Sequence, residues 1–146
     1  MNKTVFANWG SAGQGKSSTV KEISKLILKN YPTATTDPTT IDYTYDIRVV
    51  ITIGKIKIGI ESQGDPNSRL FDSLKYFVKI NCNIIICSTR TSGSTVEAVN
   101  ELYSKHGYDN VWVTNYRSNE KDQDVLNEIS AKHIFELIQL NFTGKI

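Results

Sequence analysis

The positions of apolar and polar residues divide the chain into alternating strands and helices. Apolar residues at helical spacing predict helices over 16–30, 67–80 and 122–140. The same spacing predicts one more helix, which ends at Gly107. Runs rich in apolar and β-branched residues predict strands over 4–9, 47–53, 56–60, 84–87 and 110–117. The segment 33–46 is rich in Thr and Asp and has no period, so we predict a long loop there.

The two strands at 47–53 and 56–60 are separated only by Gly54 and Lys55, a two-residue turn signal. This spacing predicts a β-hairpin over 47–60. Elsewhere strands alternate with helices, which is typical of parallel sheets with helical crossovers. We therefore predict an α/β fold, a three-layer sandwich with a mostly parallel sheet of about five strands. Helices cover both faces, and the hairpin lies at or near the sheet edge.

Length and composition narrow the class of protein. The 146 residues are typical of a single domain, and a net charge of +2 without any Lys/Arg block does not imply nucleic-acid binding. Cys82 and Cys87 do not form a C-x-x-C motif, so we predict buried free thiols and no zinc site. No long apolar run follows Met1 or approaches a membrane span, which predicts a cytoplasmic protein. The oligomeric state stays open.

One stretch carries specific chemistry. Residues 10–17 match the phosphate-binding pattern G-x-x-x-x-G-K-[ST] at every position, between a predicted strand and a predicted helix. Glycines leave the backbone N–H groups of such a loop free to meet phosphate oxygens, and the helix N-terminus adds its positive dipole end. We call residues 10–17 the glycine loop. The predicted phosphate-binding residues are Gly10, Ser11, Ala12, Gly13, Gln14, Gly15, Lys16, Ser17 and Ser18.

At this motif the chain resembles the P-loop NTPase superfamily, most closely over 4–30. The resemblance implies that residues 1–146 form a single P-loop nucleotide-binding domain that binds ATP, or another nucleoside triphosphate, with Mg²⁺. It implies that Lys16 reaches the terminal phosphates and that Ser17 joins the metal shell. The dinucleotide pattern G-x-G-x-x-G fits less well, because Gly13 and Gly15 are not followed by its third glycine.

Polar residues follow three other predicted strands. Because ligands of open parallel sheets bind beyond the carboxyl ends of the strands, we expect these residues near the glycine loop. Glu61 is predicted to activate water or contact the metal, and Asp65 to contact the metal or cap the next helix. Arg90 is predicted to stabilise transferring charge or to bind an acceptor anion, the alternative being an ion pair with Glu61 or Asp65. Tyr116 and Arg117 are candidates to border the nucleobase, the alternative being exposed residues without a ligand.

Three functions are compatible with these residues. The first is ATP hydrolysis by Lys16, Glu61 and Arg90, and the second is a small-molecule or nucleotide kinase with a separate acceptor. The third is a nucleotide-gated switch or binding module with little turnover and a protein partner. Guanine selectivity is not supported, because Asn115 is not followed by the Lys and Asp of an N-K-x-D motif.

Overall fold

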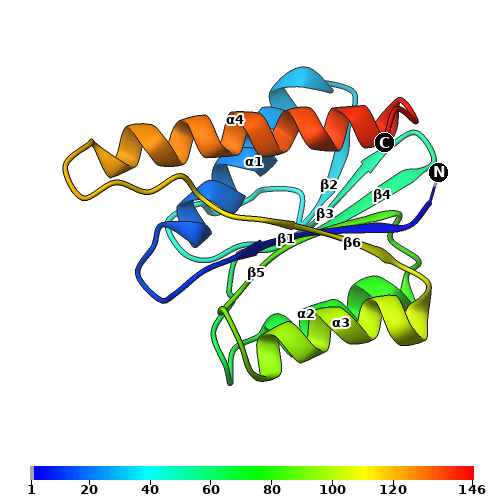
Figure 1. The fold of residues 1–146 in the computed structure, drawn as a ribbon. Coiled ribbons are helices and arrows are strands. Elements are labelled where there is room, and N and C mark those ends of the chain that lie inside the picture. The colour runs from blue at the N-terminus through cyan, green and yellow to red at the C-terminus, as the bar shows by residue number, and fades with distance from the viewer. Residues whose placement is uncertain (1) are drawn as a thin grey trace.

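The computed structural model describes residues 2–146, so Met1 of the predicted 1–146 domain lies outside the described residues. Six strands and four helices follow one another in the order β1, α1, β2, β3, β4, α2, β5, α3, β6 and α4 (Figure 1). The strands are β1 (Thr4–Trp9), β2 (Thr35–Asp37), β3 (Arg48–Ile53), β4 (Ile56–Glu61), β5 (Ile84–Thr89) and β6 (Asp109–Val113). The helices are α1 (Lys16–Asn30), α2 (Leu70–Lys79), α3 (Ser94–His106) and α4 (Gln123–Phe142).

All six strands form one mixed sheet in the order β2-β3-β4-β5-β1-β6. The pairs β4–β5, β5–β1 and β1–β6 are parallel, whereas β3 is antiparallel to both β4 and β2. The prediction of an α/β fold is confirmed. The prediction of a mostly parallel sheet of about five strands was wrong, because the hairpin reverses one strand and a sixth strand pairs beside it.

The sixth strand, β2, comes from the segment predicted to be a loop. Its three residues pair with Thr52, Ile51 and Val50 of β3, so β2 and not the hairpin forms that edge of the sheet. A strand of three polar residues has no alternation that a pattern search can detect, and only pairing with β3 makes it a strand. The hairpin β3–β4 itself is present, with its turn between Ile53 and Ile56.

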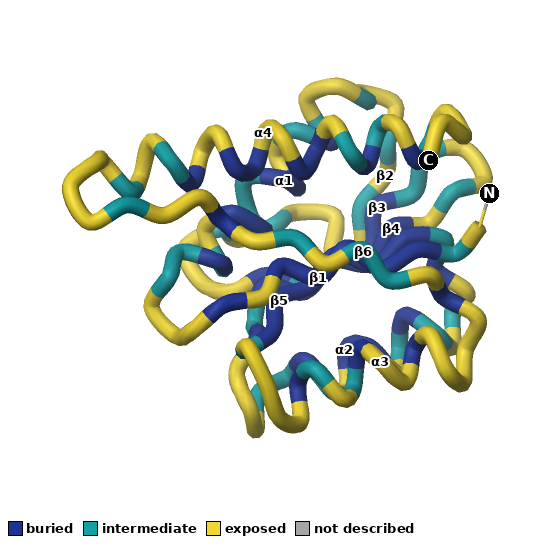
Figure 2. Tube along the Cα trace, viewed as in Figure 1, coloured by how far each residue is buried: buried dark blue, intermediate teal, exposed yellow. Residues whose placement is uncertain are grey.

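Helices lie on both sides of the sheet, α1 and α4 on one side and α2 and α3 on the other (Figure 1). One apolar cluster joins α1 and α4 to residues such as Phe6 and Ile60, and a second joins α2 and α3 to residues such as Val5 and Ile85. Buried positions run along the strands and the inner sides of the helices (Figure 2). Successive strand residues therefore serve opposite clusters, as the pleat of a sheet requires.

Close packing of α2 on the sheet depends on Gly59 in β4. A Cβ added at Gly59 would lie 2.5 Å from Cγ of Phe77, a fully buried residue of α2. Any side chain at residue 59 would overlap the Phe77 ring. The glycine therefore allows α2 to approach the sheet closely. The far end of β4, which carries Glu61 and the residues after it, is positioned by this contact.

Both cysteines are free and buried. Burial raises the pKa of Cys82 and of Cys87 to about 12, so neither thiol ionises near neutral pH. Within residues 2–146, none of the helices combines the length and the apolar character that crossing a bilayer would need.

Candidate functional site

The glycine loop joins the end of β1 to the start of α1. Gly13 and Gly15 have φ of 72° and 74°, values that residues with a side chain rarely adopt. A Cβ at Gly15 would also lie 2.3 Å from Nδ2 of Asn127 in α4. The first turn of α1 holds no acidic residue and has no side-chain cap. The loop therefore directs the positive end of the α1 dipole outward.

Lys16 is held at the centre of this loop. Its Nζ donates to the carbonyl oxygens of Gly10, at 2.6 Å, and Thr89, at 2.7 Å, and only 8% of the residue is exposed. Burial lowers the pKa of Lys16, and the nearby charge of Arg90 lowers it further, while Asp65 opposes both. The two carbonyls fix an ammonium group between the ends of β1 and β5.

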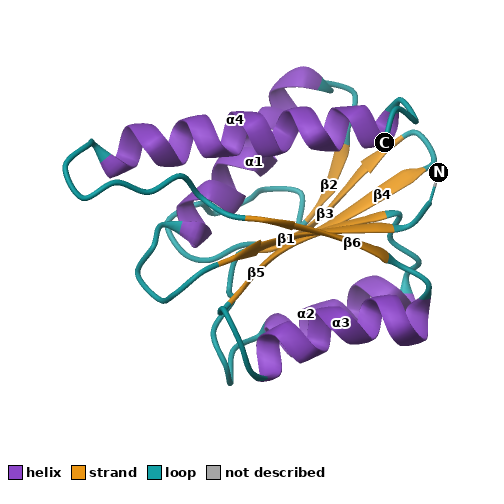
Figure 3. Cartoon of the chain, in the orientation of Figure 1, coloured by secondary structure: helices purple, strands orange, loops and turns teal. Residues whose placement is uncertain are grey.

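A cleft of about 240 Å³ lies between the glycine loop, the segment that follows β4, Asp46 before β3, and Ser88 near the end of β5. The turns after β1, β5 and β6 lie together at the carboxyl ends of these parallel strands (Figure 3). The residues that line the cleft are Ala12, Gly13, Gln14, Gly15, Lys16, Ser17, Asp46, Ser62, Gln63, Gly64, Asp65, Ser68 and Ser88. Seven of them were predicted site residues, the six from Ala12 to Ser17 and Asp65.

The other predicted loop residues do not line this cleft. The carbonyl of Gly10 binds Lys16, and the backbone N–H of Ser11 donates to Oε1 of Gln14 at 3.1 Å. Ser18 lines a separate cavity of about 320 Å³, beside Lys21 and Lys25 of α1. Gly10 and Ser11 thus shape the loop, and Ser18 faces its far side.

Asp46 and Ser62 belong to the cleft although sequence reasoning did not select them. Asp46 Oδ1 accepts from Ser17 Oγ at 2.5 Å and from Ser62 Oγ at 2.7 Å. Burial raises the pKa of Asp46, but these two hydrogen bonds and the charges of Lys21 and Arg69 together outweigh that effect, and the net pKa is lowered. A signal for both residues was present in the hairpin, because antiparallel pairing puts the start of β3 beside the end of β4.

Glu61 does not line this cleft. It is fully buried, and its two oxygens accept four hydrogen bonds, from Arg69 Nε at 2.6 Å and Nη2 at 3.0 Å, Ser73 Oγ at 2.6 Å and the Gln63 N–H at 3.0 Å. Ile58 and Ile60 face the α1 side, so strand alternation turns Glu61 toward α2. The four acceptor positions of the carboxylate are thus occupied, and the role of Glu61 in activating water or binding metal stays a prediction.

Asp65 and Arg90 pair with each other at the rim. Arg90 Nε lies 3.0 Å from Asp65 Oδ1, and the two side chains are 36% and 64% exposed. The ion pair predicted as one alternative for Arg90 is present, with Asp65 as the partner. Asp65 lines the cleft and does not cap α2, because the N–H of Leu70, the first residue of α2, donates to Ser68 Oγ at 3.2 Å.

Tyr116 and Arg117 lie outside the cleft. The Tyr116 hydroxyl is 2.7 Å from Nδ1 of His133 in α4, and the two rings meet edge to face. Arg117 is exposed. Neither residue is among those that line the cleft.

Asn115, directly before Tyr116, is hydrogen-bonded to residues of the elements that adjoin the glycine loop. Its Nδ2 donates to Thr19 Oγ1 at 2.7 Å and to Asn127 Oδ1 at 2.9 Å, and its Oδ1 accepts from Asn8 Nδ2 at 2.9 Å. These buried bonds connect the end of β6 to β1, α1 and α4. Asn115 therefore fixes the elements on which the loop is built, through a network in which each partner is costly to remove.

Ser88 is a buried hydroxyl that lines the cleft. It is 1% exposed, and within residues 2–146 its Oγ has no hydrogen-bond partner. Gly64 packs directly on its backbone, since a Cβ there would lie 2.7 Å from the Ser88 carbonyl oxygen. Buried hydroxyls without a partner are uncommon and often mark a functional site.

The oxygen atoms around Ser17 match the preferences of Mg²⁺. Hydroxyl and carboxylate oxygens from Ser17, Ser62, Asp46 and Asp65 meet in or beside one cleft, and Mg²⁺ is usually held by one or two carboxylates with waters and substrate phosphates. Among the residues described, no three His, Cys, Asp or Glu side chains converge as a metal cage. A metal here would need oxygens from a ligand.

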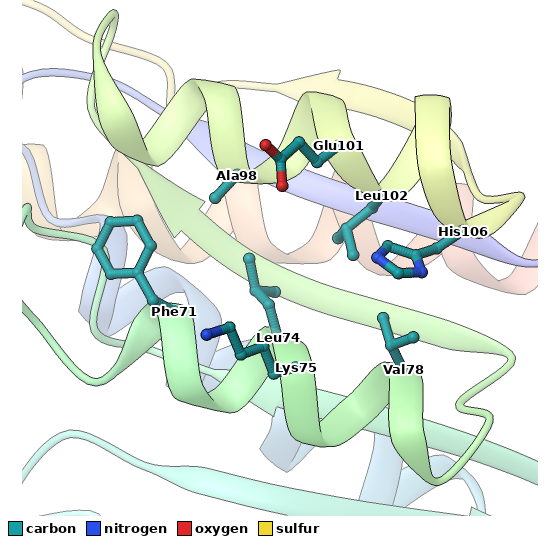
Figure 4. Close-up of a pocket in the computed structure, with 8 residues that line it drawn as sticks. All are labelled: Phe71, Leu74, Lys75, Val78, Ala98, Glu101, Leu102 and His106. Atoms are coloured by element: carbon teal, nitrogen blue, oxygen red, sulfur yellow. The ribbon is translucent and has the colours of Figure 1, made fainter.

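A further cavity of about 240 Å³ lies between α2 and α3, away from the glycine loop (Figure 4). Apolar side chains such as Phe71 and Leu74 of α2 face Leu102 of α3 across it, with Lys75 and Glu101 at its rim. None of its lining residues belongs to a strand end, so it shares no side chain with the candidate site.

No protein-family model matches the chain, and no curated protein sequence matches it. Among solved structures, the crystal structure of APE1195 is similar with a TM-score of 0.42 and 13% sequence identity, over 99% of this chain and 74% of that chain. A score this low indicates neither a common fold nor a common activity.

Proposed function

We propose that the cleft binds a nucleoside triphosphate with Mg²⁺ and transfers its terminal phosphoryl group, most simply to water. The observation that carries this proposal is the position of Lys16, held between Gly10 and Thr89 beside the uncapped N-terminus of α1 and facing a cleft with Asp46. The match of the glycine loop to P-loop NTPases supports the same function.

The chain supplies positive charge where phosphates would lie. The glycine loop offers backbone N–H groups and a helix dipole, and Lys16 offers a nearly buried ammonium group. Its lowered pKa reflects burial and the proximity of Arg90, so a bound polyphosphate would neutralise charges that now oppose each other. Arg90 can turn from Asp65 toward the phosphates, because their ion pair is exposed and weak.

Ser17 and Asp46 are the residues we assign to the metal. Ser17 Oγ would ligate Mg²⁺ while it donates to Asp46, and this bond is already made. Asp65 is the second cleft carboxylate available to it. When bound, Mg²⁺ would neutralise charge on the phosphate oxygens. We do not assign this role to Glu61, whose oxygens serve Arg69 and Ser73.

A second candidate is transfer to a small-molecule acceptor. The burial of Glu61 favours it, because the carboxylate predicted to activate water does not reach the cleft. Asp65 at the open rim would then accept the proton of an acceptor hydroxyl. The two candidates differ in whether phosphate is released from ATP alone.

The proposed function agrees with a three-layer α/β sandwich that forms a single nucleotide-binding domain, which we also propose. Helices on both sides of the sheet support this architecture (Figure 1). Two buried free thiols favour a reducing compartment such as the cytoplasm.

The test is a ligand screen by thermal unfolding, followed by turnover assays. ATP, GTP and inorganic tripolyphosphate are compared with and without Mg²⁺, and a ligand at 100 times its Kd stabilises the folded state by about 2.7 kcal/mol. We expect stabilisation by ATP and Mg²⁺ together. Phosphate release without an acceptor supports hydrolysis, whereas release only with an added metabolite supports the kinase. No stabilisation by any triphosphate would refute the proposal.

The metal assignment predicts the behaviour of an Asp46→Asn protein. Because Asp46 orients the Ser17 hydroxyl, its loss should weaken ATP binding in Mg²⁺ roughly 10- to 100-fold and change binding in EDTA little. Isothermal titration in both buffers measures this difference. Asp42→Asn is the control, since Asp42 is an exposed carboxylate of the same segment that bonds only the Thr44 N–H. An equal loss in both buffers would exclude a metal role.

Ser88→Ala separates ligand binding from folding. The Ser88 hydroxyl has no partner in the described chain, so its removal should change the free energy of unfolding by less than about 0.5 kcal/mol. If the hydroxyl donates to a phosphate oxygen, ATP affinity should fall about fivefold, the value of one hydrogen bond of about 1 kcal/mol. Urea unfolding and titration calorimetry measure the two quantities. Ser92→Ala, in the exposed loop beyond Arg90, is the control.

A further inference from the structure

The only two tryptophans of the chain lie on neighbouring strands. Trp9 is the last residue of β1, and Trp112 lies in β6, which pairs with β1 in parallel. In that register Trp112 is opposite Ala7, so Trp9 is two residues further along and diagonal to Trp112. Neighbouring strands are about 4.8 Å apart and a strand rises about 3.3 Å per residue, so the two backbone positions are about 8 Å apart, within reach of two indole rings.

Both indoles are on the α3 side of the sheet. Val5 and Ala7 belong to the cluster under α2 and α3, so Trp9 shares their face. On β6, Val111 and Val113 pack against the opposite cluster, which leaves Trp112 on the α3 side. The strand pleat thus puts two aromatic side chains together on one face, beside the sheet edge formed by β6.

The two rings line a cavity of about 410 Å³ together with Thr91, Val96 and Asn100. Trp9 is 38% exposed and Trp112 is 37% exposed, whereas Val5 and Ala7 on the same face of β1 are fully buried. The volume is within the range of small-molecule sites, which are mostly apolar with a few polar groups that orient the ligand. Here the Asn100 amide and the Thr91 hydroxyl are those polar groups.

We propose that Trp9 and Trp112 form an indole shelf that stacks the planar heteroaromatic ring of a nucleobase. Stacking on an aromatic side chain suits such a ring because every base has a π face. An amide such as that of Asn100 matches the donors and acceptors at a base edge. The half-buried indoles lose little conformational freedom on binding, which favours a small flat ligand.

This site goes beyond the proposed phosphoryl transfer, since stacking requires neither Lys16 nor a metal. The shelf is nevertheless next to the glycine loop along the chain, because Trp9 directly precedes Gly10, the first residue of that loop. The base therefore has two possible sources. It belongs either to the triphosphate held by the glycine loop or to a second nucleoside that acts as the acceptor.

Tryptophan fluorescence tests the shelf directly, because all of the indole emission comes from its two rings. We expect adenosine or guanosine to change this emission saturably, and ribose 5-phosphate to leave it unchanged. In Trp9→Leu and Trp112→Leu proteins, nucleoside affinity measured by calorimetry should fall roughly 5- to 150-fold. Trp112→Phe keeps a flat ring and should retain most of the affinity, which separates stacking from a structural role. Thermal unfolding confirms that each variant folds.

Two further arms identify the source of the base. If the shelf holds the base of the bound triphosphate, ATP changes the emission and blocks adenosine. If it holds a separate nucleoside, adenosine still binds when Mg²⁺-tripolyphosphate saturates the glycine loop. Either result supports the shelf, and neither depends on turnover. The proposal is overturned if no nucleoside alters the emission, or if both leucine variants bind nucleoside as tightly as the unaltered protein.

Discussion

A Lys16→Ala protein should bind ATP at least about 100-fold more weakly than the unaltered protein and show no measurable turnover. Lys16 supplies the ammonium group nearest the centre of the glycine loop, and its surroundings exclude most water. A charge-assisted hydrogen bond to phosphate is correspondingly strong there. Titration calorimetry with Mg-ATP and a phosphate-release assay measure the two effects.

Lys25→Ala is the matched control for this loss. Lys25 is an exposed lysine of the same helix, and its ammonium group lies over the Tyr43 ring at 4.7 Å, away from the cleft. We expect its ATP affinity to be within about twofold of that of the unaltered protein. Because Lys16 also bonds two carbonyls, urea unfolding must show that the Lys16 variant is folded. A folded Lys16→Ala protein that binds ATP normally would contradict the site.

The lowered pKa of Lys16 adds a dependence on pH. Phosphate binding needs the charged ammonium form, and burial together with Arg90 makes that form lose its proton at a lower pH than an ordinary lysine. ATP affinity should therefore decrease as the pH rises through the lowered pKa of Lys16, at a lower pH than for an ordinary lysine. In a Lys16→Arg protein the charge persists at every such pH, so whatever affinity remains should not show this decrease.

A Glu61→Ala protein should be less stable by about 3 kcal/mol, measured by urea unfolding. The change removes the acceptor of Arg69, Ser73 and the Gln63 N–H, and it leaves the buried Ser73 hydroxyl without that partner. Glu61 does not line the cleft. At a temperature where the variant is folded, we expect ATP affinity within about threefold of the original value.

The contrast is with Asp65→Ala, which breaks the exposed ion pair to Arg90. Its free energy of unfolding should change by less than about 1 kcal/mol, because exposed pairs contribute little. Asp65 lines the cleft, so here the larger effect should be on Mg-ATP binding or turnover. If Glu61→Ala instead kept full stability and lost turnover, Glu61 would regain the catalytic role predicted from its position at a strand end.

Two features explain why some site residues differ from those predicted: the face of a strand on which a side chain lies, and the pairing of strands that are distant in sequence. Glu61 follows an apolar strand, and such a carboxylate reads as an active-site acid. However, both faces of β4 are buried, so the pattern did not reveal which face Glu61 occupies. Asp46 and Ser62 share a hydrogen bond although 15 residues separate them along the chain, because β3 and β4 pair antiparallel. Ser62, the residue after Glu61, therefore lines the cleft beside Asp46.

The same reason applies to the ends of β5 and β6. Ser88 and Arg90 are both near the end of β5, but only Ser88 lines the cleft, whereas Arg90 pairs with Asp65. Tyr116 leaves β6 toward His133 of α4. The contact of the Tyr116 side chain depends on how α4 packs over the sheet, and this packing cannot be predicted from the residues near Tyr116.

By itself the sequence determined the features that depend only on residues close together along the chain. The helices, the hairpin turn, the buried thiols and the glycine loop each rest on one short stretch whose backbone preferences are local. Only the tertiary structure decided which strands pair and which face of a strand meets the loop. It joined β2 to the sheet, turned Glu61 toward Arg69, and brought Asp46 to Ser17. Those results depend on burial and on contacts between distant segments, which no single stretch of the chain encodes.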